Sequence, residues 1–353
     1  METEEEKVML AAVVKKPGEL VIEQVEKPEP KSRQFVIRTL AASICNATDN
    51  HILEGIFDGY HDHYPQILGH EVCGEVTELG ENVTEVKIGD RIAMYTPHGA
   101  FAEYVLVDAD GYGYAVVPDN VPDEVASICE MFDGAFRSTI ACAELKPGEK
   151  VLIIGAGPMG LTAAAAAAAC GARVCIVDYY ENRLQKALEM GAVRAYNRSR
   201  MTGDEIIHAI LKDMGPVDTA CICIALDVSE ERDAFHIPVE VLKNNGRMTG
   251  LCVEVKLDKH NHRMNPFHMI RKNIKFRHNL ERPGTIADFQ RGYDMVGEGK
   301  IPMEKLITHR ITLDQLPWAL DMCHNHPDEC IKFVVYPRIG LLCPYSVVEV
   351  ENP

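Results

Sequence analysis

Ten residues in the middle of the chain, Val151 to Gly160, constrain its fold more than any other stretch. They read VLIIGAGPMG: four apolar residues with the character of a buried strand, then glycines at positions 155, 157 and 160. Where a strand feeds a helix through such a turn, the first glycine allows a sharp bend and the second lets the backbone approach a pyrophosphate. The third lets the helix pack closely on the strand, with its N-terminus facing the phosphates. The stretch predicts a dinucleotide-binding turn.

The flanking sequence supports this interpretation, which matters because glycine-rich turns alone are common in loops. Small residues from Leu161 to Cys170 predict a tightly packed helix, and a second strand is expected from Arg173 to Val177. The strand leads into Asp178, about twenty positions after the glycines, where a carboxylate accepts hydrogen bonds from an adenosine ribose. The alternative is a doubly wound domain whose turn binds nothing. The predicted cofactor-binding residues are Gly155, Gly157, Pro158, Met159, Gly160, Asp178 and Arg183.

The charge of Asp178 favours NAD over NADP as the cofactor. Its carboxylate would face the 2′-phosphate of NADP, and even roughly 3 kcal/mol of like-charge repulsion corresponds to more than a hundredfold in affinity. Arg183 is close enough in sequence to soften this repulsion. On the predicted helix from Glu181 to Met190, however, we expect its side chain to face solvent.

Composition excludes several classes of partner and membrane placement. The chain has 353 residues, 46% of them apolar, which is enough for two domains. The 53 acidic residues exceed the 36 basic ones by 17, so nucleic acid is not an expected partner. The sequence starts METEEEK, without the order of a signal peptide, and no segment has the pattern of a membrane span, so a cytoplasmic protein is expected. Its twelve cysteines are then expected to be reduced thiols, with one or more available to a metal.

The periodicity of the chain changes near residue 145. Before it, short segments broken by Gly, Pro and Asp predict a barrel-like β domain. After it, apolar strands alternate with helical patterns to about residue 280, which predicts a parallel sheet. A helix from Thr285 to Gly297 and strands at 305–311 and 332–336 follow. The strands expected before residue 125 are Gln34–Leu40, Glu71–Glu78, Arg91–Tyr95 and Phe101–Val107.

Several short motifs occur in a fixed order along the chain: GHE at residues 69–71, GD at 89–90, GAFAEYV at 99–105 and then the glycine fingerprint. The most specific block is YPQILGHEVCGEVTELGENV at 64–83. With these motifs the chain resembles the zinc-dependent medium-chain dehydrogenase/reductase family, in particular its sorbitol and secondary-alcohol dehydrogenase branch. The resemblance implies an α/β protein with a chaperonin-10-like (GroES-like) catalytic domain at 1–145 and 286–353. It implies a Rossmann NAD-binding domain, a doubly wound parallel sheet, at 146–285.

The resemblance also implies a catalytic zinc, which suits the expected chemistry. An unassisted alcohol is too weak an acid at neutral pH, whereas zinc lowers the pKa of bound water from 15.7 to about 7, on the order of 12 kcal/mol. The ligands implied are Cys45, His70 and Glu130, with Glu71 entering the shell in place of substrate or water. Taken alone, each is also consistent with a buried thiol, a loop histidine or a solvated glutamate. The loop after residue 90 contains no cysteine, so no structural zinc is expected.

Thr48 and His51 are the implied catalytic pair, passing the alcohol proton to solvent through the cofactor ribose. The hydroxyl stands three residues after Cys45, whereas the family places it two after, so one extra residue enters this turn. The extra residue puts the position of ligand or relay in question. The alternative for His51 is a surface histidine, in which case solvent takes the proton.

Together these features predict an NAD-dependent, zinc-containing oxidoreductase acting on a secondary alcohol or ketone. The polar residues of 58–64 favour a polyol, sugar or cyclitol as substrate. Two alternatives stay open: a metal-free enone or quinone reductase of the same fold, and a non-enzymatic NAD-binding redox sensor. The family implies a homodimer or homotetramer. The apolar tail, residues 337–353, is expected to pack on the β domain or on a neighbouring subunit.

Overall fold

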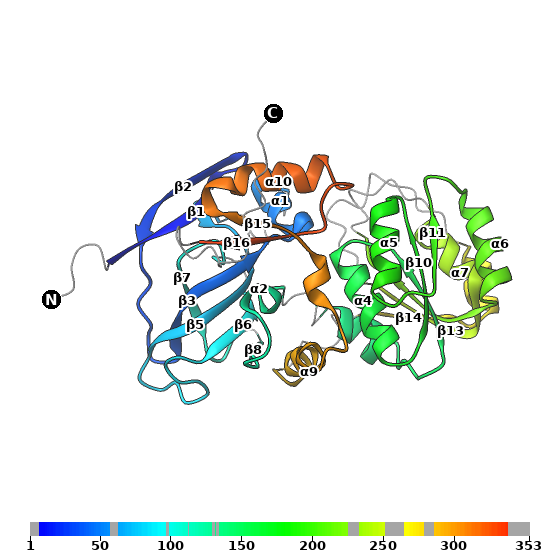
Figure 1. Cartoon of the computed structure of the whole chain (residues 1–353), viewed down its shortest axis with the longest axis horizontal. Coiled ribbons are helices and arrows are strands. Elements are labelled where there is room, and N and C mark those ends of the chain that lie inside the picture. Colours follow the sequence, from blue (N-terminus) through cyan, green and yellow to red (C-terminus); the bar gives the residue numbers. More distant parts are fainter. Residues whose placement is uncertain are drawn as a thin grey trace.

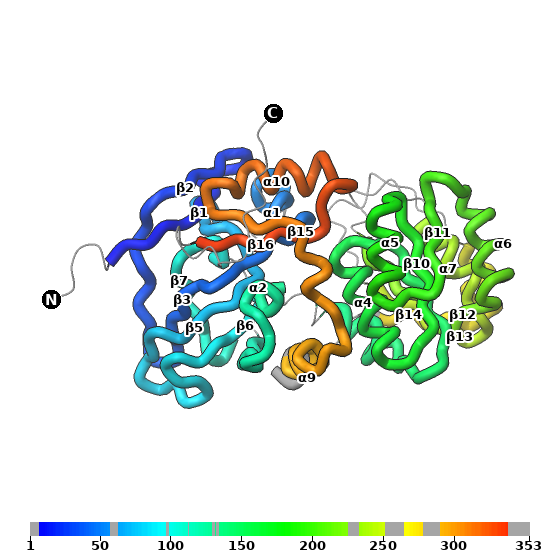
Figure 2. Tube along the Cα trace, in the orientation of Figure 1, coloured from blue at the N-terminus to red at the C-terminus, as the bar shows by residue number. Residues whose placement is uncertain are grey.

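The chain folds into two groups of strands that lie side by side (Figures 1 and 2). Strands from the N-terminal third, blue and cyan, form one group, and the green strands of the central part form the other. The computed structural model describes residues 7–56, 63–96, 99–111, 113–128, 131, 134–224, 233–250, 265–278 and 286–337. Glu130, most of the polar segment at 58–64 and the tail after Pro337 therefore lie outside the described residues.

A seven-stranded sheet organises the β-rich half, in the order β15-β16-β3-β5-β6-β8 with β7 paired to β3. Its strands are β3 (Gln34–Ser43), β5 (Glu71–Leu79), β6 (Arg91–Tyr95), β7 (Tyr104–Asp108), β8 (Tyr114–Val116), β15 (Ile307–Thr312) and β16 (Lys332–Tyr336). A three-stranded sheet adjoins it, composed of β1 (Val8–Lys16), β2 (Glu19–Glu26) and β4 (Gln66–Ile67). The predicted strands are present, although β3 runs three residues further than expected and β7 begins three residues later.

Strands β15 and β16, from the C-terminal part of the described chain, belong to the sheet of this half. In Figure 1 the orange and red elements β15, β16 and α10 lie with the blue and cyan strands, because β16 pairs antiparallel with β3. Helix α10 also packs against α1 near the start of the chain. The helical segments are α1 (Asn46–Glu54), α2 (Asp123–Ala126), α9 (Ile286–Gly297), η4 (Met303–Leu306), η5 (Leu313–Gln315) and α10 (Leu316–Asn325).

The other half contains a six-stranded parallel sheet in the order β11-β10-β9-β12-β13-β14. Numbered within this sheet, that order is 3-2-1-4-5-6, the doubly wound arrangement of a Rossmann fold. Ligands of such sheets bind beyond the carboxyl ends of the strands, where the order reverses, which here is between β9 and β12. The strands are β9 (Lys150–Ile154), β10 (Arg173–Asp178), β11 (Arg194–Asn197), β12 (Val217–Ile222), β13 (Leu242–Gly250) and β14 (Lys275–His278).

Helices cover this parallel sheet, and they pack against it through faces of small or apolar side chains. The eight residues of α4 from Gly160 to Ala167 are buried, because alanine side chains let the helix approach β9 and β10 closely. One helix was not predicted although its start carries a recognisable signal: Thr202 and Glu205 form a capping box. The segments are η2 (Phe136–Cys142), α4 (Pro158–Ala169), α5 (Glu181–Glu189), α6 (Gly203–Asp213), α7 (His236–Val241) and α8 (Pro266–Arg271). None of the described helices has the length and apolar character needed to cross a membrane.

Candidate active site

Three of the sequence-predicted metal ligands meet at one end of the seven-stranded sheet. One ligand atom each from Cys45, His70 and Glu71 lies within 4.8 Å of the other two. Strand pairing explains why: Ser43 of β3 is directly opposite Glu71 of β5, so the residues just beyond them leave the sheet together. Among the residues that the structure describes, this is the group of acidic, histidine and cysteine side chains suited to a metal ion.

The glycine before His70 is required by its surroundings. Gly69 has a φ of +88°, in the region that favours glycine, and an added Cβ would lie 2.7 Å from the ring of Phe101. Phe101 is fully buried, so the ring has no room to move aside. The imidazole of His70 packs edge-on against Tyr95, with ring centroids 5.3 Å apart. The glycine turn and this aromatic contact together direct His70 toward Cys45.

Asp49 joins two of the candidate ligands and was missed by the sequence analysis. Its Oδ2 accepts the backbone N–H of Cys45 at 2.9 Å, and its Oδ1 lies 3.1 Å from Nδ1 of His70. The carboxylate is fully buried. A carboxylate beside one ring nitrogen of a metal-binding histidine favours the proton on that nitrogen, and at His70 the nitrogen beside Asp49 is Nδ1. Its place in the TDNH segment beside the relay residues was the available signal.

Glu71 is also fully buried, and its two oxygens have different donors. Oε2 accepts a hydrogen bond from the hydroxyl of Ser43, and Oε1 lies 2.9 Å from Nζ of Lys332. Lys332 was not predicted to belong to the site. The signal was a single charged residue at the head of the strand KFVVY, every residue of which is buried.

The implied relay residues lie on α1, directly after Cys45. Helix α1 starts at Asn46, so Thr48 and His51 are three residues apart on one helix and face similar directions. His51 is only 2% exposed, so the alternative of a surface histidine is wrong. Thr48 is half-buried. The contacts of Asp49 with Cys45 and His70 are made with the extra residue in place.

The glycine-rich turn has the steric features expected of a dinucleotide site. Gly155 has a φ of +95°, and a Cβ there would lie 2.6 Å from the carbonyl oxygen of Cys223. A Cβ on Gly160 would lie 1.8 Å from the carbonyl oxygen of Gly155, so the helix and the turn are in close contact. Gly157 differs, because a Cβ there would meet no atom within 4 Å. That open side is where a pyrophosphate can approach the backbone.

The residues that follow the glycines lie where a bound cofactor would reach them. Pro158 occupies the first turn of α4 and, like Met159, is only half-buried. Asp178 ends β10 with its carboxylate facing the glycine-rich turn: Oδ2 accepts the backbone N–H of Ala156 at 2.6 Å, and Oδ1 that of Tyr180 at 2.8 Å. Each carboxylate oxygen retains lone pairs for a ribose hydroxyl.

The expectation that Arg183 faces solvent is wrong. Its side chain is half-buried and donates a hydrogen bond to the carbonyl oxygen of Cys330 at 3.3 Å, with the ring of Tyr180 5.0 Å from its guanidinium carbon. The neighbouring Asn182 donates to the carbonyl oxygen of Asp328. The first turn of α5 thus contacts the segment that leads into β16, a contact between residues about 147 apart in sequence that no local pattern indicates.

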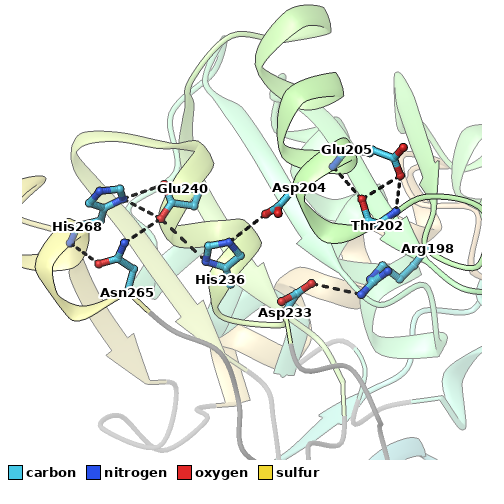
Figure 3. Close-up of polar contacts among 9 residues, drawn as sticks. All are labelled: Arg198, Thr202, Asp204, Glu205, Asp233, His236, Glu240, Asn265 and His268. Carbon is cyan, nitrogen blue, oxygen red and sulfur yellow. Dashed lines mark hydrogen bonds and ion pairs between the residues drawn. The ribbon is translucent and has the colours of Figure 1, made fainter.

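Polar contacts beyond the end of β11 include one made by Arg198, the residue after that strand. Figure 3 shows Arg198 beside Asp233, with an N–O distance of 3.2 Å. In the same view His236 lies between Asp204 and Glu240. Glu240 also accepts a hydrogen bond from His268. These contacts tie α6, α7 and α8 together, and they hold the guanidinium of Arg198 against an acidic partner.

Comparison with known proteins places these features in a family. The model of the alcohol dehydrogenase GroES-like domain matches residues 31–119, and that of the zinc-binding dehydrogenase domain matches residues 158–298. Sorbitol dehydrogenase 1 of Saccharomyces cerevisiae is 26% identical over 92% of this chain and 97% of its own length. An L-threonine 3-dehydrogenase of Shewanella loihica is 31% identical over 64% of this chain and 72% of its own length. The 2R,3R-butanediol dehydrogenase structure from Bacillus subtilis superimposes with a TM-score of 0.80 at 24% identity, covering 94% of this chain and all of that one.

These matches confirm the fold class expected from the sequence, a GroES-like β domain joined to a Rossmann domain. They extend over both halves of the molecule, and the named relatives are dehydrogenases of alcohols, polyols or hydroxy amino acids. The chain belongs to the zinc-dependent medium-chain dehydrogenase/reductase family, within the alcohol dehydrogenase superfamily.

Proposed function

We propose that this protein is a zinc-dependent oxidoreductase that transfers hydride between NAD and a secondary alcohol or its ketone, with a polyol, sugar or cyclitol as substrate. The observation that carries the proposal is the convergence of Cys45, His70 and Glu71 within 4.8 Å. The same chain supplies a Rossmann sheet whose glycine-rich turn is open at Gly157.

The donor set fits zinc. One thiolate, one imidazole and one carboxylate are ligands that zinc accepts, and catalytic zinc sites use three protein ligands with one position open. When bound there, zinc would act as a Lewis acid that makes the substrate hydroxyl more acidic. By resemblance to the family, Glu130 is the proposed third ligand, and Glu71 would then occupy the fourth position in place of substrate or water.

Protein side chains would then handle the proton and the orientation of the ligands. Asp49, whose Oδ1 lies 3.1 Å from Nδ1 of His70, would keep the imidazole proton on Nδ1, so that Nε2 would be the lone-pair donor. Thr48 would accept the proton from the substrate hydroxyl and pass it on, with His51 as the final base of the relay through the cofactor ribose. From His51, which is 2% exposed, the proton would pass to solvent.

NAD is the proposed cofactor because of the charges around the adenosine end. Asp178 presents a carboxylate at the end of β10, and like-charge contact with a 2′-phosphate costs several kcal/mol. The cations nearby have other partners: Arg183 donates to the carbonyl oxygen of Cys330, and Arg198 pairs with Asp233. This arrangement supports ribose recognition by Asp178 in preference to phosphate recognition by arginine.

We also propose the domain limits. The Rossmann domain would span 146–285, and the catalytic domain would comprise the rest of the chain.

A homodimer is the proposed assembly. Among the described strands, β14 lies at the end of the parallel sheet, where its backbone would pair with a second copy across a twofold axis. Exposed apolar side chains stand on β14 and α8, Phe276 at 45%, Phe267 at 66% and Ile270 at 80%, and such a dimer would cover them. Light scattering on a Phe267→Ser, Ile270→Ser variant should show monomers where the parent forms dimers.

One experiment tests the central proposal. NAD reduction is followed across a panel of polyols, sugars and amino alcohols, with zinc content measured on the same freshly purified sample. Turnover with one zinc per chain, lost on chelation and restored by zinc, is the expected result. Chelator-resistant turnover of an enone or quinone without bound metal would replace the proposal with the metal-free reductase. NADH binding without turnover on the whole panel would leave a non-enzymatic sensor.

A further inference from the structure

A buried ion pair stands directly behind the candidate metal site. The ammonium of Lys332 lies 2.9 Å from Oε1 of Glu71, and the two side chains are 1% and 0% exposed. The ammonium also donates to the carbonyl oxygen of Ile44 at 2.8 Å. Burying two charges is costly enough that such a pair is weak evidence for a purely stabilising role. The location of this pair suggests a role in the site instead.

Both oxygens of the Glu71 carboxylate have donors. Oε1 accepts from Lys332 and Oε2 from Ser43, and one of these two oxygens also belongs to the group that can hold a metal ion with Cys45 and His70. A nearby ammonium partly offsets the negative charge of a carboxylate. Less of that charge is then available to a divalent cation, which binds more weakly but stays more electrophilic.

We propose that Lys332 is a positioning residue that sets how strongly Glu71 binds the catalytic metal, and so tunes both metal affinity and metal acidity. The inference rests on the proposed function, since it concerns the same metal site. It also gives strand β16 a role in the site, because β16 places Lys332 beside Glu71 although the two residues are 261 positions apart in sequence. Ser43 contacts the other oxygen without charge, and it provides a matched control.

The test compares variants by their affinity for zinc and by the spectrum of the cobalt-loaded protein. In Lys332→Met the full charge of Glu71 becomes available, so zinc should bind more tightly, by roughly tenfold if about 1.4 kcal/mol of attraction is regained. The visible absorption bands of bound cobalt should shift. The thiolate-to-cobalt band should remain, which would show that Cys45 still binds the metal. Lys332→Arg should restore the parent values, and Ser43→Ala should change zinc affinity much less. Once a substrate is known, the pH profile of turnover in Lys332→Met should shift toward higher pH, because a metal that Glu71 binds more tightly is less electrophilic.

Coupling between the two residues provides the decisive comparison. In a Glu71→Gln background Lys332→Met should no longer tighten zinc binding, because the charge that it releases is absent. Unchanged or weaker zinc binding in Lys332→Met, or the same gain with and without Glu71, would overturn the inference.

Folding of the variant adds a second measurement. Without Lys332 the metal becomes the charge partner of Glu71, so zinc should raise the melting temperature of Lys332→Met more than that of the parent. Failure to fold even with zinc present would also overturn the inference. Parent protein that binds zinc but turns over no substrate would sink the proposed function alone. Turnover in the parent with no effect of Lys332→Met on zinc would sink only the role of Lys332.

Discussion

Asp49→Asn is the sharpest probe of the candidate metal site, because it changes one buried atom and little of the shape. The amide oxygen of asparagine can still accept the backbone N–H of Cys45, so the start of α1 should be retained. Its NH₂ group, however, would face Nδ1 of His70 where a carboxylate oxygen now lies 3.1 Å away. An NH₂ group only donates, so the imidazole proton would move to Nε2, the nitrogen that would bind the metal.

The expected loss follows from this geometry. Removing the carboxylate partner of a metal-bound histidine typically weakens metal binding by about 10- to 100-fold. Zinc affinity should therefore fall by roughly 10- to 100-fold, which is about 1.4 to 2.7 kcal/mol. Turnover at saturating zinc should fall as well, since the orientation of His70 is no longer set.

Zinc affinity is measured by competition with a chromophoric chelator at neutral pH, alongside thermal unfolding of the metal-free protein. Glu54→Gln removes an exposed carboxylate from the same helix and should behave like the parent. If Asp49→Asn folds normally and binds zinc as tightly as the parent, Asp49 does not orient His70, and the assignment of Nε2 as the ligand atom fails.

Three further predictions concern the rest of the molecule. Gly160→Ala places a Cβ 1.8 Å from the carbonyl oxygen of Gly155, so NAD titration should show lost binding and calorimetry a lower melting temperature; normal NAD affinity would contradict the packing role. Asp178→Ala removes the charge facing a 2′-phosphate, and the ratio of kcat/KM for NADP over NAD should rise by roughly 10- to 100-fold; an unchanged ratio would show that another group selects the cofactor. The hydrogen bond from Arg33 lowers the pKa of Glu85 to about 2 from a usual 4.5. Because the folded pKa is the lower one, this pair stabilises the fold above about pH 4.5 and its contribution disappears as the pH falls to about 2. Arg33→Gln should thus lower the melting temperature near pH 6 and converge with the parent toward pH 2, whereas a constant difference would point to packing.

Local patterns were sufficient for much of the fold. The glycine-rich turn, the strand ending at Asp178 and the change of periodicity near residue 145 depend on neighbours within one element, so the printed order of residues reveals them. The same holds for His70 and Glu71, which are adjacent in the chain, and for the lone cysteine before α1. The helix α6 was missed although its capping box at Thr202 was equally local.

Tertiary structure alone decided which side chains surround those ligands. Asp49 reaches Nδ1 of His70 because α1 packs where β3 and β5 end, and neither spacing nor composition contains that contact. Arg183 is on a helix face that the sequence predicted to be exposed, but in the fold this residue contacts Cys330 in the segment before β16. Lys332 is the clearest case: a lysine in an apolar strand is costly to bury, and only the fold shows the carboxylate of Glu71 that makes its burial tolerable. The sequence by itself determined the candidate ligand types and the glycine-rich turn, since these depend on local chemistry. The charged groups beside the candidate metal site come from other elements, α1 for Asp49 and β16 for Lys332, which is 261 positions from Glu71, and only chain folding brings them together.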